Sequence, residues 1–299
     1  MNRVAIIGLG NWGKKLLATF NKIAYISVCC TTGNKENLDW LNSHFPTIKY
    51  TKNFEEVIHD GKIDAIIIAT PIDTHYEITR KTLLANKHVF VEKPLSTSTE
   101  QAKELLKIAK ERKRILFTGN LFLYNDIFTH LEKLNKTSPF EHIAWNWNKF
   151  GTFKENIFWN LAWHDILMSV KLMGKAIDVK LTSYDGYTPD KDAVRILLDF
   201  ENNKKSSISI NRLSKSTEKS GLFITKDKSY AWSNGSLSFA SKGSKELKVI
   251  LQSATSALVV ECKAFIDLLN NDSSKIDDDE IILETIRIIE NLMRKTYGN

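Results

Sequence analysis

The chain has 299 residues, of which 42% are hydrophobic and 26% are charged. This composition is typical of a folded globular protein and excludes a disordered, collagen-like or coiled-coil chain. The length allows two domains of ordinary size. Apolar stretches such as Ile66 to Ala69 fall far short of the ~20 residues that cross a bilayer, so no membrane span is predicted.

Basic residues exceed acidic ones by seven, which suits nucleic acid, an anionic substrate or no particular partner. The densest basic cluster, between Lys103 and Arg114, lies on a predicted helix that also carries glutamates. Such spaced opposite charges are typical of a solvated face, so no nucleic-acid partner is predicted. The cysteines form no Cys-x-x-Cys pair and the amino-terminal residues show no cleavable secretory signal, so we expect a cytoplasmic protein.

From residue 3 to about residue 118, short apolar runs alternate with helical patterns. This alternation predicts a parallel sheet that is covered on both faces, which is a doubly wound α/β domain. We assign it to residues 1–120. The predicted strands are Val4–Gly8, Tyr25–Cys30, Ile48–Thr51, Ala65–Thr70, His88–Val91 and Ile115–Thr118, and the predicted helices are Gly13–Asn21, Lys35–Ser43, Phe54–His59, Thr74–Asn86 and Thr97–Glu111.

After about residue 135 the pattern changes to strands with partial alternation, separated by polar turns. These strands predict an antiparallel sheet, and Asn234-Gly235 is a type I′ hairpin signal. Residues 121–299 are therefore predicted to form a second, α+β domain. Its predicted strands are His142–Lys149, Val179–Tyr184, Val194–Phe200, Ser206–Leu213 and Leu222–Thr225, and two helices follow at Thr255–Leu269 and Asp278–Arg294, the second preceded by Asp277.

A glycine-rich turn follows the first predicted strand. Gly8, Gly10 and Gly13 have the spacing that permits a tight turn, a close approach of a diphosphate to bare backbone, and close packing of a helix on a strand. The amino terminus of the next helix would donate its N–H groups to the anion. We therefore predict dinucleotide binding at this turn; the alternative is a purely structural glycine turn.

The end of the second predicted strand bears on the choice between NAD and NADP. An NAD site usually has an acidic residue there, whereas this chain has Thr31, Thr32 and then Lys35. Hydroxyls and a cation favour NADP modestly over NAD, with Lys35 as the candidate partner of the 2′-phosphate. Alternatively, Lys35 simply begins a solvated helix.

Two tripeptides follow neighbouring strands, Ala69-Thr70-Pro71 and Glu92-Lys93-Pro94. Ligands of open parallel sheets bind outside the carboxyl ends of the strands, so both should face the cofactor crevice. Lys93 is predicted to orient the substrate or take part in catalysis. The alternative is a solvated surface charge.

The segment from Phe158 to Ile166 places Asn160 and His164 four residues apart. If it is helical, both side chains share one face, with Leu167 one turn further on. On spacing alone, a histidine among aromatic residues is more often a packed core residue than a catalyst.

Together these motifs resemble the Gfo/Idh/MocA oxidoreductase family, and a looser similarity is to its nucleotide-sugar and polysaccharide biosynthesis branch. The resemblance rests on Gly8 to Gly13, Ala69-Thr70-Pro71 with His75, Glu92-Lys93-Pro94, the 117–124 stretch, His164-Asp165, and the last helices with Glu261 and Phe265. It implies a Rossmann domain, a second domain with an open, mostly antiparallel sheet, and a homodimer or homotetramer. It also implies hydride transfer between a nicotinamide and a sugar or nucleotide-sugar carbinol.

The family resemblance assigns roles to particular residues. Lys93 and His164 are expected to act on the reacting hydroxyl, although Asn160 stands where the family usually has aspartate, and Trp163 where proline is common. The predicted cofactor-binding residues are Gly8, Gly10, Asn11, Trp12, Gly13, Thr31, Thr32, Lys35, Ala69, Thr70, Pro71, His75, Glu92 and Lys93. The predicted substrate-binding residues are Lys93, Asn120, Tyr124, Lys149, Asn160 and His164.

Two alternatives to a dehydrogenase or reductase remain open. One is an NAD(P)-binding sensor or complex subunit that has lost turnover through Asn160 and neighbouring changes. The other is elimination or glycosidic cleavage assisted by the cofactor without net oxidation. No metal site is predicted, since the chain has no His-Glu-x-x-His and no Cys-x-x-Cys motif.

Overall fold

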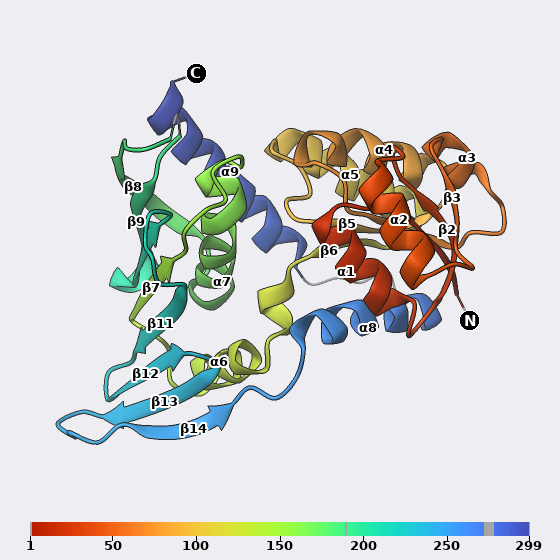
Figure 1. Ribbon diagram of the computed structural model, residues 1–299. Helices are drawn as coiled ribbons and strands as arrows, with labels where there is room; N and C mark the ends of the chain where they lie inside the picture. Colours follow the sequence, from red (N-terminus) through yellow and green to blue (C-terminus); the bar gives the residue numbers. More distant parts are fainter. Residues whose placement is uncertain (1, 189, 272–277, 299) are drawn as a thin grey trace. The chain divides into compact units, whose positions relative to one another are not determined.

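The computed structural model describes residues 2–188, 190–271 and 278–298 (Figure 1). Their contacts divide the chain into two compact units. The first contains the residues up to Leu121 together with Ser256–Asp279, and the second contains Phe122–Thr255 and the residues from Glu280 onward. Each unit thus consists of two segments of the chain, whereas the predicted domains, 1–120 and 121–299, are each one continuous segment.

The first unit is built on a parallel sheet of six strands in the order β3-β2-β1-β4-β5-β6. The strands are β1 (Arg3–Ile7), β2 (Tyr25–Cys30), β3 (Lys49–Thr51), β4 (Ala65–Ile68), β5 (His88–Glu92) and β6 (Leu116–Gly119). Every residue of β4 is buried, as expected for a strand with helices on both faces. This order confirms the predicted doubly wound domain, and its switch point lies between β1 and β4.

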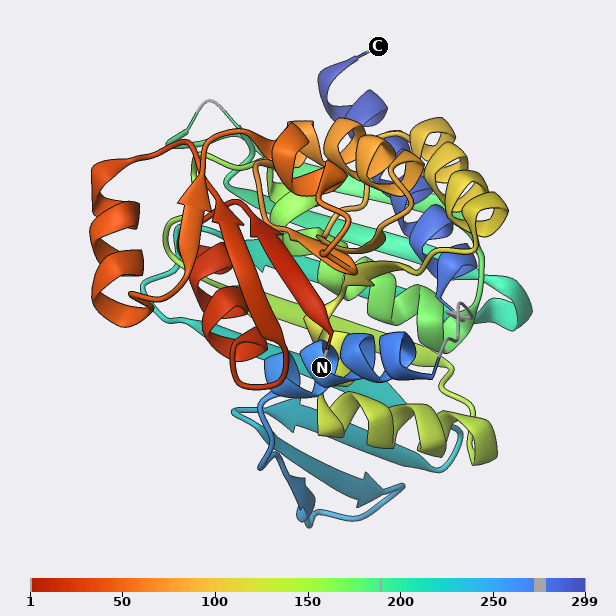
Figure 2. The ribbon, with the colours of Figure 1, turned by 90° about the vertical axis from the view of Figure 1, so that its right-hand side faces the viewer.

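Helices cover both faces of this sheet. They are α1 (Asn11–Phe20), α2 (Lys35–His44), α3 (Phe54–His59), α4 (His75–Leu84), α5 (Thr99–Arg112) and α8 (Ala257–Asn270), with a 3₁₀ turn η1 (Ile72–Thr74) before α4. Helix α1 contacts α8, and α4 contacts α5. Figure 2 shows the strands between these two pairs of helices.

Aromatic packing explains why α8 belongs to the first unit. Phe265 of α8 is fully buried, and its ring lies edge-on to Phe20, Phe90 and Phe117, with centroids 5.6 to 6.1 Å apart. Rings at such separations in edge-to-face geometry stabilise a core beyond their buried area. The helix therefore completes the core under β5 and β6.

The second unit is built on an eight-stranded sheet in the order β14-β13-β12-β11-β7-β10-β9-β8. Its strands are β7 (His142–Asn148), β8 (Ala176–Tyr184), β9 (Ala193–Phe200), β10 (Lys205–Asn211), β11 (Glu218–Ile224), β12 (Lys228–Ser233), β13 (Ser236–Ser241) and β14 (Lys248–Gln252). All neighbouring pairs are antiparallel except β7 with β10. The predicted mostly antiparallel sheet is thus confirmed.

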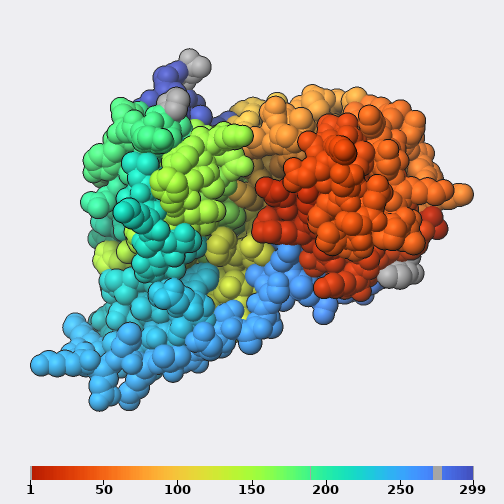
Figure 3. Space-filling model, viewed as in Figure 1, coloured from red at the N-terminus to blue at the C-terminus, as the bar shows by residue number. Residues whose placement is uncertain are grey.

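Helices line one face of this second sheet. They are α6 (Asp126–Thr137), α7 (Trp163–Met173) and α9 (Asp279–Tyr297), and shorter turns are η2 (Leu121–Tyr124), η3 (Phe158–Ala162) and η4 (Glu201–Asn203). Figure 1 shows α7 and α9 along this face, and Figure 3 shows the hairpin of β13 and β14, in light blue, projecting from the rest of the unit. Among the described residues, none of the helices is both long and apolar enough to cross a membrane.

Some local predictions need correction. Strand β11 begins four residues before Leu222, and neither α6 nor β14 was predicted. The hairpin signal was right, since Asn234 and Gly235 both have positive φ, as a type I′ turn requires. Asp277, predicted to precede the last helix, lies outside the described residues.

Candidate functional site

The three glycines of the turn after β1 have different surroundings. Gly8 has a φ of +99°, and a Cβ atom there would lie 2.5 Å from the Ala69 carbonyl oxygen and 2.9 Å from the Thr70 nitrogen. A Cβ on Gly13 would lie 2.1 Å from the Gly8 oxygen. Around Gly10, by contrast, no heavy atom lies within 4 Å of the Cβ position. Packing therefore requires Gly8 and Gly13, while Gly10 presents bare backbone to open space.

Helix α1 begins at this turn without a side-chain cap. Asn34 and Ser98 cap α2 and α5 through side-chain oxygens, but Gly10 at the start of α1 has no side chain to do so. The first backbone bond of α1 runs from the Lys14 N–H to the Gly10 carbonyl, at 2.9 Å. The earlier N–H groups of the helix have no intrahelical acceptor. This uncapped terminus, with open space at Gly10, fits the diphosphate of a dinucleotide.

A cation that was not predicted lies against the loop after β2. A Cβ atom on Gly33 would lie 2.4 Å from Lys52 Cε and 3.0 Å from its Nζ, so the Lys52 side chain crosses this loop. Thr31 is buried, and its N–H donates to the Thr51 carbonyl at 3.0 Å. Lys35 is exposed at the first position of α2. Lys52 follows β3, the strand beside β2, and its place in the sequence thus indicated a position near this loop.

His75 connects the two strand-end tripeptides. Its Nδ1 lies 2.7 Å from the Pro94 carbonyl oxygen and its Nε2 lies 2.9 Å from the Thr70 carbonyl oxygen. Burial lowers the pKa of His75, and a neutral imidazole can donate to only one of these carbonyls at a time. The Lys93–Pro94 bond is cis. The imidazole therefore joins the backbone after β4 to the backbone after β5 at the carboxyl edge of the sheet.

Two buried carboxyl groups lie behind this edge. The Trp12 indole N–H donates to Glu92 Oε1, which joins the glycine turn to the end of β5. Burial raises the pKa of Glu92 to about 7. Burial, and then the charge of Glu92, also raise the pKa of Glu261 on α8. The predicted substrate contact Asn120 is buried in the same unit, and its side-chain amide donates to the Thr118 carbonyl at 3.3 Å.

The segment that carries His164 is helical, but its first turn is a π-helix. Residues Phe158–Ala162 form this π turn, and α7 continues from Trp163. The Asn156 side-chain oxygen accepts from the N–H groups of Phe158 and Trp159, at 3.0 and 3.3 Å. Asn160 N–H donates to the Asn156 carbonyl at 2.9 Å. Single π turns occur frequently at functional sites.

The rings of Phe122 and Trp147 lie close to the His164 imidazole. The ring centroid of Phe122 lies 4.8 Å from it and that of Trp147 lies 5.8 Å away. The Lys149 ammonium lies 6.0 Å from the Trp147 ring, so the second unit brings two of the predicted substrate contacts to one indole. The second unit also contains the predicted substrate contacts Tyr124 and Asn160. Tyr124 is half-buried in η2, and Asn160 is half-buried in η3.

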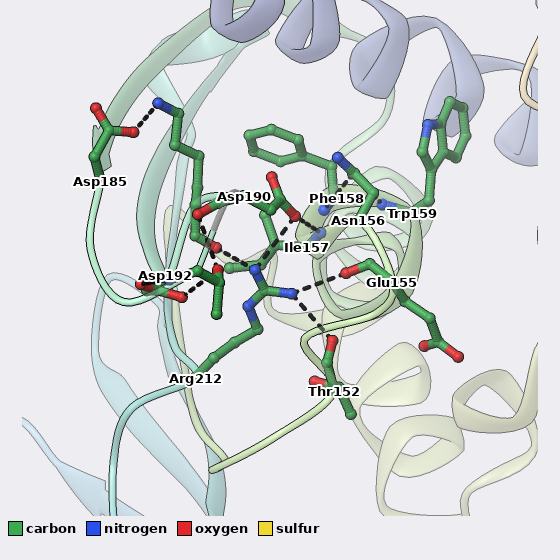
Figure 4. Close-up of polar contacts among 12 residues, drawn as sticks. Thr152, Glu155, Asn156, Ile157, Phe158, Trp159, Asp185, Asp190, Asp192 and Arg212 are labelled. Carbon is green, nitrogen blue, oxygen red and sulfur yellow. Dashed lines mark hydrogen bonds and ion pairs between the residues drawn. The ribbon is translucent and has the colours of Figure 1, made fainter.

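A buried arginine holds the loop that leads into η3. The Arg212 guanidinium donates to the carbonyls of Thr152, Glu155 and Lys191 at 3.1, 2.8 and 2.6 Å, and it pairs with Asp190 at 3.3 Å (Figure 4). Asp190 also accepts from the Ile157 N–H, directly before the π turn. Arg212 was not among the predicted site residues. The alternation of β10 continues past the strand to this residue and indicated an inward position.

The two residues expected to act on the hydroxyl lie in different units. Lys93 belongs to the first unit and His164 to the second. Within the first unit the predicted cofactor residues gather at one sheet edge, because β1, β2, β4 and β5 are parallel and end there. That Lys93 and His164 meet at one substrate stays a prediction.

Residues 2–120 match the model of the oxidoreductase family with an NAD-binding Rossmann fold. The uncharacterized oxidoreductase YdgJ of Escherichia coli strain K12 is 27% identical over 197 residues, which are 59% of this chain and 55% of that protein. The UDP-N-acetylglucosamine 3-dehydrogenase of Acidithiobacillus ferrooxidans is 23% identical over 51% of this chain and 50% of its own length. The match therefore spans about half the length of these curated relatives.

Solved structures resemble the chain over nearly its whole length. The crystal form of UDP-N-acetylglucosamine 3-dehydrogenase GnnA from Acidithiobacillus ferrooxidans has a TM-score of 0.88 at 17% identity, covering 97% of this chain and 95% of that one. Biliverdin reductase from Synechocystis sp. PCC 6803, in complex with biliverdin and NADP+, has a TM-score of 0.84 at 17% identity and 98% coverage of both chains. These likenesses concern the fold, which is compatible with different substrates. The family match covers residues 2–120, and over this range the chain is similar to the Gfo/Idh/MocA oxidoreductases.

Proposed function

We propose that this protein catalyses hydride transfer between a nicotinamide cofactor and a carbinol or ketone of a sugar or nucleotide sugar. The observation that carries the proposal is the turn at Gly8 to Gly13, where open space at Gly10 adjoins the uncapped start of α1. The nicotinamide ring, when bound, accepts or supplies the hydride. The sugar class rests on the family and on the UDP-N-acetylglucosamine 3-dehydrogenase relative.

The protein's own groups manage the proton. His164 removes the hydroxyl proton during oxidation and returns it during reduction, as a positioned imidazole can near neutral pH. Lys93 donates a hydrogen bond to the same oxygen and stabilises its developing negative charge. Asn160 hydrogen-bonds without carrying a charge. Asn120, Tyr124 and Lys149 are the remaining proposed substrate contacts.

NADP is the proposed preferred cofactor. The loop after β2 contains no carboxylate that would repel a 2′-phosphate, and two lysines adjoin it, Lys35 in sequence and Lys52 in space. Thr32, in the same loop, is exposed. A cytoplasmic location and a homodimer or homotetramer stay predictions.

A pair of glycine variants tests the cofactor site. Gly10→Ala adds a methyl group where the structure has open space, so the fold should persist, but the diphosphate can no longer approach the backbone. We expect calorimetry to show NADPH binding weakened at least about tenfold, or 1.4 kcal/mol. Gly61→Ala is the matched control, since it also meets nothing within 4 Å and lies in a loop away from the turn. Equal affinity in both variants would contradict the cofactor assignment.

A second experiment tests the reaction. Purified protein is assayed with NADP+ and NAD+ against a panel of sugars and nucleotide sugars. We expect Lys93→Ala and His164→Ala each to lose at least about a hundredfold in turnover while NADPH still binds. NADPH binding without turnover of any panel member would instead favour the non-catalytic sensor. Retained cofactor with substrate cleavage and no net oxidation would favour cofactor-assisted elimination.

A further inference from the structure

A lysine, Lys219, lies close to the two aromatic rings that contact His164, Phe122 and Trp147. Strands β7 and β11 are antiparallel neighbours, and their register places Lys219 opposite Trp147 and Gly221 opposite Trp145. A Cβ atom on Gly221 would lie 2.8 Å from the Trp145 ring, so this position lets the indole lie across the strand. The Lys219 ammonium is 3.7 Å from the Trp147 ring centroid, 4.7 Å from that of Phe122 and 5.8 Å from that of Trp145.

A buried carboxylate holds this ammonium in place. Lys219 Nζ donates to Asp165 Oδ1, and the Asp165 side chain is completely buried while that of Lys219 is 17% exposed. Burial lowers the pKa of Lys219 and raises that of Asp165, and the attraction between the two charges opposes both shifts. Asp165 Oδ2 has no hydrogen-bond partner among the described residues. Apolar side chains of similar volume often stabilise a fold as much as a buried ion pair does. A gain in fold stability therefore does not explain why this pair, with its unsatisfied oxygen, is present.

The ion pair is coupled to His164 in two ways. Asp165 directly follows His164 in the chain, and both lie in the first turn of α7. Phe122 and Trp147, which contact the imidazole, are also the two rings nearest the ammonium. Cation–π attraction holds a ring face toward the charge. A fixed ammonium therefore restricts the orientations of both rings, and these rings border the imidazole.

We propose that Lys219 is a positioning residue, whose ammonium, paired with Asp165, fixes Phe122 and Trp147 against the His164 imidazole. This inference rests on the proposed function, in which His164 transfers the hydroxyl proton. Lys219 itself moves no proton in this arrangement. Its contribution is to keep the imidazole in one orientation, which matters because small misplacements of a catalytic group reduce rates strongly.

The experiment compares four variants with the wild type. Lys219→Arg retains the cation, the ion pair and the stacking. Lys219→Met removes the ammonium at similar length, and the double variant Lys219→Met/Asp165→Asn removes both charges, so that no unpaired buried carboxylate remains. Lys228→Met is the matched control, since Lys228, on β12 of the same sheet, lies 5.7 Å from the ring of Phe239 on β13.

The first measurement is the NMR signal of the His164 ring, assigned by its loss in His164→Gln and recorded without substrate. Ring currents from Phe122 and Trp147 make this signal sensitive to their orientation. We expect the signal to move in Lys219→Met and in the double variant, and to stay near the wild-type position in Lys219→Arg and Lys228→Met. A wild-type signal in a folded double variant would overturn the proposal.

The second measurement is turnover on the best substrate of the panel. We expect the double variant to lose at least about tenfold in kcat with KM little changed, and Lys219→Arg to recover most of the loss. Unchanged kcat with a moved signal would overturn the link to the reaction. Loss of kcat with an unmoved signal would overturn positioning and indicate direct contact with the substrate. If instead His164→Ala retains full turnover, the proposed function fails, while the signal still tests the ring contacts.

Discussion

Glu92 makes the stability of the first unit depend on pH, and Glu92→Gln tests this. The Glu92 side chain is 9% exposed, and burial raises its pKa from 4.5 to about 7. Each tenfold change in an ionisation constant corresponds to about 1.4 kcal/mol. The free energy of unfolding is therefore lower by about 3 kcal/mol when Glu92 is ionised than when it is protonated. The amide of glutamine does not ionise and can still accept from the Trp12 indole.

The direction follows from which state holds the proton. Above pH 4.5 the unfolded chain releases the Glu92 proton, whereas the folded chain retains it until about pH 7. The unfolded state then binds fewer protons, so the free energy of unfolding falls as pH rises through this range. From pH 5 to pH 8 the loss is about 2 to 3 kcal/mol. Glu261, whose pKa is also raised, adds a loss of the same sign.

Hydrogen exchange measures this free energy for the first unit alone. Peptides from β4 and β5 are followed by mass spectrometry at several pH values without added nucleotide, after correction for intrinsic exchange rates. We expect protection to fall with pH in the wild type and in Glu77→Gln, a control on the exposed surface of α4. In Glu92→Gln the fall should be much smaller. An identical pH dependence in Glu92→Gln and the wild type would refute the reasoning.

Three further variants extend these tests. Arg212→Met removes the guanidinium from Asp190 and from three backbone carbonyls, so the second unit should lose about 3 kcal/mol or more in urea unfolding, and a change below about 1 kcal/mol would show that the clamp is dispensable. Lys52→Glu should weaken NADPH binding relative to NADH in calorimetry, and an unchanged ratio would remove Lys52 from the 2′-phosphate site. Phe265→Ala should lower protection of β5 and β6 by about 3 to 5 kcal/mol; protection at the wild-type level would mean that α8 does not complete this core.

Much of the first unit follows from short stretches of sequence. Buried parallel strands are nearly all apolar, and helices between them have their own periodicity, so the order of elements could be predicted without tertiary information. The turn at Gly8 to Gly13 is similarly local, because its conformation depends on residues within one loop. The packing of Gly8 on Ala69, by contrast, is a contact between β1 and β4 that only their pairing creates.

Three charged residues that were not predicted contact residues far from them in the chain. Lys52 reaches the loop after β2, Arg212 ties the loop before η3 to the loop between β8 and β9, and Lys219 pairs with Asp165. The sequence by itself determined the Rossmann elements, the glycine turn, the place of Lys93 after a strand and that of His164 on a helix. Only the tertiary structure decided which charged side chains face inward, because a side chain's face depends on strand register, and register is set by long-range pairing that local periodicity does not specify.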